Sequence, residues 1–311
     1  MTAQSNRNNL IGIASLCAGV FVFSVQDAIV KAISGEHAVT LAIMLRAIVS
    51  FPILVMMVWL EGGLKLLNTP QWPLLCLRGI ILLTAYTTYF IAFPALPLAE
   101  AIALFFTVPL LITVMSGPLL GEHVGLKAWA AVAIGLVGVF IILQPGTALF
   151  KPAALLSLIS AATYALSMIL ARKYGTSTPA SVMAFYQNTV YLLGALAIAV
   201  FTNVFRIQMT GDPSFDFLVR PWGVPPLFDL TLMGICGVIA AFGMVFLTHA
   251  YRVGSANIVT PFEYTGMIWG SIWGFLFFNE VPRISTFMGM GLIAVAGMLA
   301  LQAGAKKGEA R

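Results

Sequence analysis

Charged residues are scarce in this chain. Asp, Glu, Lys and Arg make up 9% of its 311 residues, whereas hydrophobic residues make up 60%. A soluble domain is roughly half apolar and a quarter charged, so this composition excludes one. Apolar runs of the roughly 20 residues that a helix needs to cross a bilayer follow one another almost continuously. The runs do not alternate as barrel strands do, and the sequence therefore predicts an all-α polytopic membrane protein.

Cysteine and the common catalytic motifs are also rare or missing. The three cysteines, Cys17, Cys76 and Cys236, each lie inside an apolar run, which excludes a disulfide framework and offers no zinc-ligand spacing. There is no P-loop, no HExxH and no GxSxG, and no potassium-filter signature. The three histidines lie far apart in the sequence. We therefore expect no enzyme activity, no metal site and no cofactor.

The basic residues indicate topology rather than a nucleic-acid partner. The formal net charge is +5, but the Lys and Arg residues stand singly at the ends of runs instead of forming a stripe. Basic residues are enriched in cytoplasmic loops. If the amino terminus lies inside the cell, the basic residues outside the spans divide into a larger cytoplasmic set and a smaller external set. The cytoplasmic set is Arg7, Lys65, Lys127, Arg172, Lys173, Arg252, Lys306, Lys307 and Arg311, against Lys31, Lys151, Arg206, Arg220 and Arg283 outside. Both termini are thus predicted to be cytoplasmic.

Runs and turn residues together predict ten transmembrane helices. The first run follows a short polar start and is too long for a signal-peptide core, so we expect it to be retained. Only one connection, 206–226, is long. The predicted spans are 10–33, 39–60, 72–93, 97–119, 126–144, 152–172, 179–204, 227–250, 254–278 and 285–303.

Two distant stretches, 98–122 and 254–280, resemble each other and indicate that the chain is built twice. Each starts with small residues, carries one proline in an apolar run and closes on a glutamate. The matches are Ala99, Ala101 and Ile102 with Ser255, Asn257 and Ile258, Pro109 with Pro261, Glu122 with Glu280, and Ile134 and Gly138 with Ile293 and Gly297. A repeat of five spans places its second copy upside down in the membrane. The predicted repeats are 10–144 and 152–303.

Glu263 is a candidate for binding or coupling because a charge inside a span is costly. It follows Pro261, whose missing amide leaves a backbone carbonyl without a partner, and it precedes Tyr264. Such a group can bind a cation, an ammonium group or a proton. The alternative is a glutamate that is protonated or paired against the next helix. Both interpretations stay open at this point.

Three further charges are expected at similar depth. Asp27 and Lys31 are four residues apart on the first span, so they can meet on one helical face. Arg46 on the second span is expected to pair with Asp27 or Glu100, because unpaired charges at this depth would be very costly. For Asp27 and Lys31 the alternative to a neutralising pair is a substrate site. For Asp27 and Arg46 a structural clasp and a coupling or gating role both stay open.

Aromatic and amide side chains inside the spans predict a cavity for an amphipathic metabolite. The alternative is an ordinary interfacial belt of Tyr and Trp. The candidates for contact with substrate are Tyr86, Tyr89, Tyr164, Gln187, Glu263 and Trp269, and those for coupling or gating are Glu263, Asp27, Arg46, Pro109 and Pro261. Gly270 and Gly274 form a GxxxG pattern, which indicates close helix packing, more in keeping with an internal face than with a dimer contact.

These features resemble the drug/metabolite transporter superfamily, in particular its ten-helix branch built from two EamA repeats. The residues that carry the resemblance are Ala99, Ala101, Pro109, Glu122 and the GLVGV run Gly135–Val139, their counterparts Ser255, Glu280 and Gly297, and the opening run Phe23–Lys31 followed by Arg46. The resemblance covers about residues 10 to 303. One departure is that Pro261 comes earlier in its span than Pro109 does.

The resemblance implies a secondary carrier whose helices surround a central cavity, with the fifth and tenth spans outermost. Known members include exporters of aromatic and other amino acids, and carriers of S-adenosylmethionine and riboflavin. We expect an exporter of amino acids or similar small metabolites across the bacterial inner membrane by alternating access, with the small-molecule substrate and the lipid bilayer as its partners. The alternative is an importer of a nucleoside-like or flavin-like compound. A membrane enzyme or a scaffold with a solid apolar interior is a third, less favoured possibility. The oligomeric state is not predicted, and a monomer fits the sequence.

Overall fold

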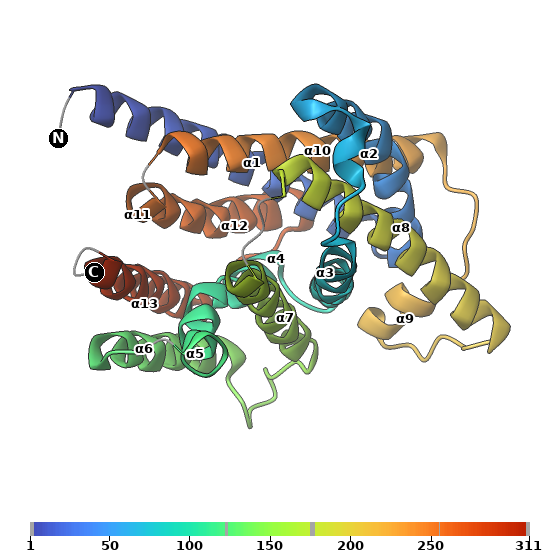
Figure 1. The fold of residues 1–311 in the computed structure, drawn as a ribbon. Coiled ribbons are helices and arrows are strands. Elements are labelled where there is room, and N and C mark those ends of the chain that lie inside the picture. Colours follow the sequence, from blue (N-terminus) through green and yellow to red (C-terminus); the bar gives the residue numbers. More distant parts are fainter. Residues whose placement is uncertain (1–2, 122–123, 175–177, 255, 309–311) are drawn as a thin grey trace.

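The structure, a computed structural model, describes residues 3–121, 124–174, 178–254 and 256–308, and those residues are helical with short connections (Figure 1). The repeat residues Glu122 and Ser255 lie outside this described part. The helices are α1 Ala3–Ile33, α2 Val39–Gly62, η1 Leu64–Leu67, α3 Trp72–Ala92, α4 Leu98–Phe105, α5 Val108–Leu120, α6 Leu126–Leu143, α7 Ala153–Tyr174, α8 Ala180–Val204, α9 Pro213–Val219, α10 Leu227–Val253, α11 Ala256–Val259, η2 Thr260–Tyr264, α12 Thr265–Phe278 and α13 Ile284–Gly308.

Nine segments of the described chain are long and apolar enough to cross a membrane. They correspond to nine of the ten predicted spans, and α4 and α5 together form one of them, Leu98–Leu120. The remaining predicted span, 254–278, is divided among α11, η2 and α12, and α12 alone has only 14 residues. The long connection contains the short helix α9, which begins where the Asp212 side chain accepts a hydrogen bond from the Phe215 amide. The chain is thus an all-α polytopic membrane protein.

The fourth and ninth spans are both broken, and the breaks touch. The first break lies at Phe106 and Thr107, and Pro109 is the second residue of the helix that follows it. The second break is the 3₁₀ turn η2, which contains Pro261. Proline lacks the amide that would continue the helical hydrogen bonds. The rings of Phe106 and Tyr264 lie 5.4 Å apart between centroids. The prolines sit differently in their spans, as the sequence indicates, yet the two interruptions face each other.

The main packing contacts between the helices are kept when the two halves are exchanged. In this exchange α1 corresponds to α7, α2 to α8, α3 to α10 and α6 to α13. The broken span formed by α4 and α5 corresponds to the one formed by α11 and α12. The contact of α1 with α10 then becomes that of α7 with α3, and α2 with α10 becomes α8 with α3. The pairs α2 with α8, α4 with α12, and α6 with α13 map onto themselves. This is the packing expected of an inverted five-span repeat.

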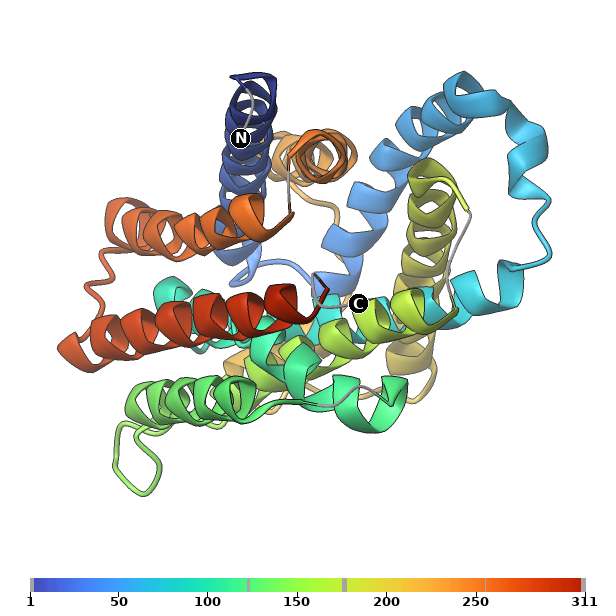
Figure 2. The same cartoon turned by 60° about the vertical axis from the view of Figure 1, so that its left-hand side comes forward.

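The helices α6 and α13 lie side by side at one edge of the bundle (Figures 1 and 2), as expected for the fifth and tenth spans. Glycines let their backbones touch. A methyl group added to Gly138 would lie 2.9 Å from the Gly289 carbonyl oxygen, and one added to Gly289 would lie 2.7 Å from the Gly138 carbonyl oxygen. Gly270 is similarly closed in by Ile102 of α4 at 2.5 Å. The glycines of α12 therefore serve internal packing.

Gly297 on α13 provides a prediction about stability. A methyl group there would lie 1.5 Å from the hydroxyl oxygen of Tyr264, a buried atom without a hydrogen-bond partner in the described part of the chain. Gly297→Ala is expected to lower the free energy of unfolding by about 1–3 kcal/mol, since overpacking forces the ring to move. The measurement is the thermal unfolding midpoint of the purified protein in detergent.

Gly291 is the matched control on the same helix, because a methyl group there meets nothing within 4 Å. Gly291→Ala is expected to leave the midpoint unchanged or to raise it slightly, since alanine favours a helix over glycine. Equal midpoints for the two variants would contradict the close contact between Gly297 and Tyr264.

Candidate functional site

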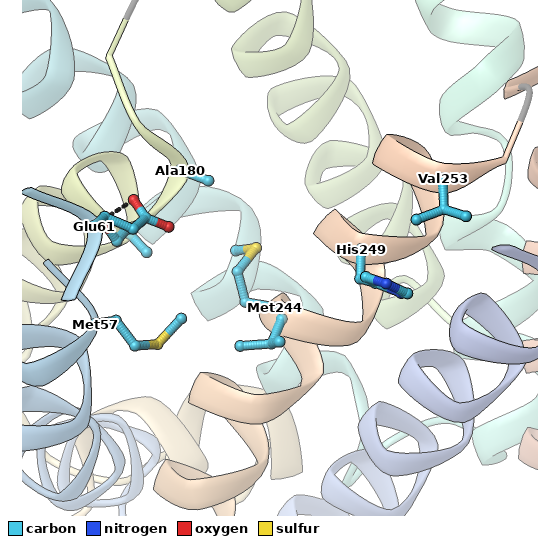
Figure 3. Close-up of a pocket in the computed structure, with 9 residues that line it drawn as sticks. Met57, Glu61, Ala180, Met244, His249 and Val253 are labelled. Carbon is cyan, nitrogen blue, oxygen red and sulfur yellow. Dashed lines mark hydrogen bonds between the residues drawn. The ribbon is translucent and has the colours of Figure 1, made fainter. Parts of the chain in front are cut away.

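A cavity of about 510 Å³ opens at one end of the bundle between α2, α8 and α10 (Figure 3). We call the end at which α1 begins the N side and the opposite end the distal side. The lining residues are Met57, Glu61, Ala180, Ser181, Ala184, Met244, Val245, His249 and Val253. They lie at the end of α2, the start of α8 and the end of α10, so the cavity is on the N side. A hollow between the two halves disfavours a solid scaffold.

The mouth of this cavity is held by polar contacts between helices. The Ser181 hydroxyl of α8 donates to a carboxylate oxygen of Glu61 on α2 at 2.6 Å (Figure 3). The His249 Nδ1 on α10 lies 3.0 Å from the Ser15 hydroxyl of α1. Between them, Met57 and Met244 supply flexible apolar surface. The mouth therefore combines apolar walls with a few polar groups, as small-molecule sites commonly do.

The faces of α2 and α8 that line the cavity continue toward a polar cluster deeper in the membrane. Residues three and four positions apart lie on one face of a helix. On α2 this face runs from Met57 to Arg46, about three turns further in. On α8 it runs from Ala184 to Gln187 and Tyr191. The polar cluster is therefore in line with the cavity, toward the distal side.

Arg46 is the centre of this cluster. Its Nε donates to the amide oxygen of Gln26 at 3.1 Å. The guanidinium carbon lies 5.4 Å from the ring centroid of Tyr86 and 5.7 Å from that of Tyr191. The amide nitrogen of Gln187 donates to the Tyr191 hydroxyl at 2.9 Å. Two sequence-predicted residues, Tyr86 and Gln187, are thus brought together with Arg46.

Asp27 joins the cluster through Tyr89. The Tyr89 hydroxyl donates to a carboxylate oxygen of Asp27 at 3.0 Å, joining α3 to α1. The expected pairing of Asp27 with Lys31 is wrong, because Lys31 reaches outward to Glu280 instead. The expected contact of Arg46 with Asp27 or Glu100 is also wrong, because no ion pair of Arg46 shorter than 4.0 Å occurs among the described residues. Asp27 and Arg46 attract each other only across a gap.

Two ion pairs on the distal side join the two halves of the chain. Lys31 Nζ lies 2.5 Å from a carboxylate oxygen of Glu280, and their side chains are 8% and 24% exposed. Arg283 lies 3.0 Å from Glu100, whose side chain is 6% exposed. Glu280 also accepts from the backbone amide of Leu98 at 2.8 Å, at the start of α4. Lys31 and Glu100 belong to the first half, and Glu280 and Arg283 to the second.

The remaining sequence candidates surround the cluster less directly. Glu263 lies in η2 and interacts electrostatically with Tyr164 of α7 and with Tyr264. The Tyr164 ring packs on Phe105 at 5.4 Å, next to the break in the fourth span. Tyr164 and Glu263 thus belong to the region where the broken spans meet.

Trp269 is placed differently from the other candidates. It stacks on Trp273 at 5.7 Å and meets Phe21 of α1 edge to face at 4.9 Å. Trp273 in turn donates to the Ser24 hydroxyl at 2.9 Å. Among the contacts of the described residues, none joins Trp269 to Arg46 or to the tyrosines around it. Its role in substrate contact stays a prediction.

The distal ion pairs are the part of the arrangement that reasoning from the sequence missed. Glu280 was singled out only as the last residue of a repeat, and Arg283 only as a topology signal. The sequence does contain a signal for these ion pairs. Glu280 and Arg283 lie on either side of Pro282 in one short turn, so an acidic and a basic side chain there can each bind a partner. The pairing still depends on which helix ends lie beside that turn.

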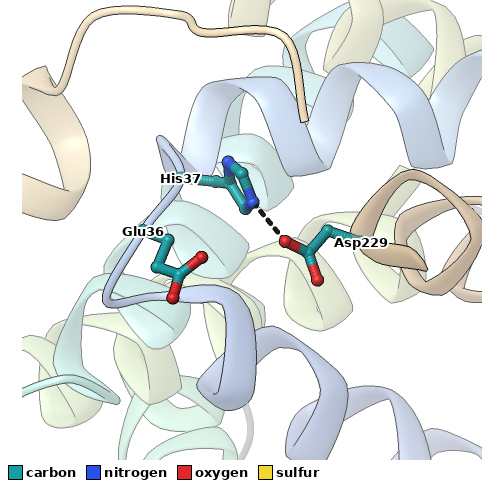
Figure 4. A group of neighbouring side chains, drawn as sticks. All are labelled: Glu36, His37 and Asp229. Carbon is teal, nitrogen blue, oxygen red and sulfur yellow. Dashed lines mark hydrogen bonds and ion pairs between the residues drawn. The ribbon is translucent and has the colours of Figure 1, made fainter. Parts of the chain in front are cut away.

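A third polar group lies on the distal side, between the turn after α1 and the start of α10 (Figure 4). The Nε2 of His37 lies 2.8 Å from a carboxylate oxygen of Asp229, and the Glu36 carboxylate is close by. Arg220 donates to the backbone oxygens of Ser34 and His37. We interpret this group as a tie between two helix ends, and the absence of a metal site stays a prediction.

Comparisons with known proteins place the chain among transporters. The family model described as the EamA-like transporter family matches residues 10–144 and 151–302. The chain is 28% identical to a pseudopaline exporter of Pseudomonas aeruginosa over 89% of this chain and 90% of that protein. It is 24% identical to an S-adenosylmethionine uptake transporter of Rickettsia prowazekii over 75% of this chain and 73% of that protein.

Two further similarities concern a riboflavin transporter and a solved fold. The chain is 31% identical to a riboflavin transporter of Rhizobium johnstonii over 67% of this chain and 63% of that protein. A crystal structure that is 19% identical superposes with a TM-score of 0.63 over 95% of this chain and 97% of that one. The last similarity concerns the fold alone.

Proposed function

The chain belongs to the EamA-like transporter family, and from that premise we propose that it exports amino acids or similar small metabolites across the bacterial inner membrane by alternating access. The supporting observation is the polar cluster around Arg46, which lies in line with a cavity open on the N side and behind ion pairs on the distal side. A carrier must close one end of its site while the other is open. This arrangement corresponds to one such state.

In this proposal the N side faces the cytoplasm, as the distribution of basic residues indicates. Substrate then enters from the cytoplasm between α2, α8 and α10 and moves toward Arg46, Gln187 and the tyrosines. Release requires the distal ion pairs to separate, and the broken fourth and ninth spans supply the bends for that movement.

The alternative function is import of a nucleoside-like or flavin-like compound. Relatives named as S-adenosylmethionine uptake and riboflavin transporters favour it, and a relative named as an exporter favours export. The tyrosine-rich cluster suits a flat ring in either case.

Counterflow in proteoliposomes tests the proposal. Liposomes that contain the purified chain are loaded with one unlabelled amino acid at a time, and uptake of the labelled form is followed. We expect rapid uptake of at least one amino acid, and weaker competition by S-adenosylmethionine and riboflavin. If no amino acid exchanges while one of those two compounds does, the alternative function replaces export.

Glu263 is proposed as the group that couples transport to a proton. An amide cannot exchange a proton, so Glu263→Gln is expected to abolish uptake driven by a proton gradient while the protein still folds. The measurement compares gradient-driven uptake of the variant with that of Glu36→Gln, a matched change at an exposed carboxylate on the distal turn. Unchanged gradient-driven uptake by Glu263→Gln would dismiss the role.

A further inference from the structure

Arg46 carries a buried positive charge that no carboxylate in the described part of the chain neutralises by contact. Its residue surface is 7% exposed. Within the described chain, the guanidinium makes one hydrogen bond, to Gln26, and no ion pair shorter than 4.0 Å. A guanidinium has five N–H donors, and charged groups inside spans are normally paired. Most of the hydrogen-bonding capacity of Arg46 is therefore unused by its neighbours.

The tyrosines beside Arg46 stabilise its charge without using these donors. The rings of Tyr86 and Tyr191 lie 5.4 and 5.7 Å from the guanidinium carbon, a range in which a ring attracts a cation. A ring face has no carboxylate oxygens to accept the paired N–H groups of a guanidinium fork. The environment therefore keeps Arg46 charged while its donors stay available to a ligand.

The space next to Arg46 is narrow on its distal side in this conformation. A void of about 10 Å³ lies between Arg46, Val30, Phe90, Met233 and Cys236. Such a void is about large enough for one water molecule. From the distal side a ligand can pass only when the helices there separate, whereas the way in from the N side follows the faces of α2 and α8. The site thus has the location expected of a binding point that opens during transport.

Asp27 supplies the opposite charge at a distance. Tyr89 holds its carboxylate at 3.0 Å, and Asp27 is half-buried. Asp27 and Arg46 interact electrostatically, yet they do not touch. Two opposite charges kept apart in a membrane match a ligand that carries both charges itself.

We propose that Arg46 binds the carboxylate of the transported molecule and that Asp27 binds its ammonium group. The substrate class is then the α-amino acids and other molecules that carry an amino-carboxylate head. This inference rests on the proposed function and adds to it the two groups that recognise the substrate. Neutral molecules without a carboxylate are excluded from tight binding at this site.

The experiment measures competition against counterflow of the amino acid that the wild-type chain transports best. The competitors are that amino acid, its carboxamide, and the amine left after decarboxylation. In the wild type we expect the amino acid to compete roughly ten- to a hundredfold better than either analogue, the range for a hydrogen-bonded charge. In Arg46→Gln that advantage is expected to disappear, and in Arg46→Lys to be reduced.

Arg220→Gln is the control, because it removes the same charge on the distal side, where the Arg220 side chain donates to backbone oxygens of the turn after α1. It should keep the wild-type preference for the amino acid. Size-exclusion elution reports whether each variant folds. Should Arg46→Gln fail to fold, the wild-type comparison and Arg46→Lys still decide the matter.

The outcomes separate the two proposals. If the carboxamide competes as well as the amino acid in the wild type, or if Arg46→Gln or Arg46→Lys keeps the full preference, the role of Arg46 is overturned while amino-acid export stands. If none of the twenty amino acids exchanges in the wild type, the proposed function falls, and this inference falls with it.

Discussion

Glu280→Gln is expected to open the distal side of the protein more than a hundredfold more often. The Lys31 side chain is 8% exposed, and among the described residues it would keep one charge-independent partner, the backbone oxygen of Leu96. Removing one member of a buried ion pair costs roughly 3–5 kcal/mol. The pair joins the two halves only while the distal side is closed, so this cost falls on the closed state. Each increment of about 1.4 kcal/mol changes the ratio of open to closed protein by a factor of ten.

Cys236 is a native reporter of this opening. It is 2% exposed and borders the closed void beside Arg46. In a background with Cys17→Ala and Cys76→Ala, a membrane-impermeant maleimide added outside whole cells should label Cys236 slowly in the wild type. It should label Cys236 much faster in Glu280→Gln.

Glu36→Gln is the matched control for this measurement. Glu36 is an exposed glutamate on the same side of the protein, and its replacement should leave the labelling rate unchanged. Equal labelling rates for Glu280→Gln and Glu36→Gln would show that the ion pair does not hold the distal side closed.

The second large effect is expected at Asp27. Asp27→Asn removes the carboxylate that faces Arg46 and is held by Tyr89, so we expect amino-acid transport to fall at least a hundredfold. Tyr89→Phe removes only the hydrogen bond to Asp27, and a hydrogen bond to a charged group is worth about 1.5–3 kcal/mol. Its expected loss is roughly tenfold, at the lower end of that range. Initial rates of counterflow measure both losses.

A double-mutant cycle separates transport from stability at this site. Asp27→Asn alone leaves the Arg46 charge without its distant counter-charge, so the unfolding midpoint should fall. Adding Arg46→Gln removes the charge that is left over and should restore part of the midpoint, with a coupling energy of about 0.5–3 kcal/mol. Transport should not return. If the change in midpoint of the double variant equals the sum of the two single changes, the two charges do not interact. Restored transport would contradict their role in binding. Asp212→Asn, at the start of α9, is the surface control.

The spans of this fold were predictable because the bilayer leaves few alternatives to a helix. Each unpaired backbone group in hydrocarbon is costly, so a long apolar run such as 126–144 becomes one helix, here α6 from Leu126 to Leu143. The breaks in the fourth and ninth spans were less predictable. Pro109 and Pro261 mark their neighbourhood, but the 3₁₀ turn at Thr260–Tyr264 depends on packing against Phe106.

The candidate site could be predicted by residue type but not by pairing. A charge within a span is conspicuous in any sequence, and Asp27, Arg46 and Glu263 were found on that ground. Their partners depend on how helices cross, and spacing along a single helix was misleading. Asp27 and Lys31 have the spacing of a helical ion pair, yet Lys31 finds Glu280 more than two hundred residues away, because the turn before α13 lies beside the end of α1.

The glycine contact between α6 and α13 has a mechanical consequence for the proposed rocking motion. Where the backbones of Gly138 and Gly289 already touch, neither residue has a side chain whose rearrangement could absorb sliding, and Ile142 and Ile293 fill the space beside them. The two helices therefore act as a fixed pivot. Displacement grows with distance from that pivot, so α2 and α8, on the opposite edge of the bundle, swing farthest, and the cavity mouth lies between them.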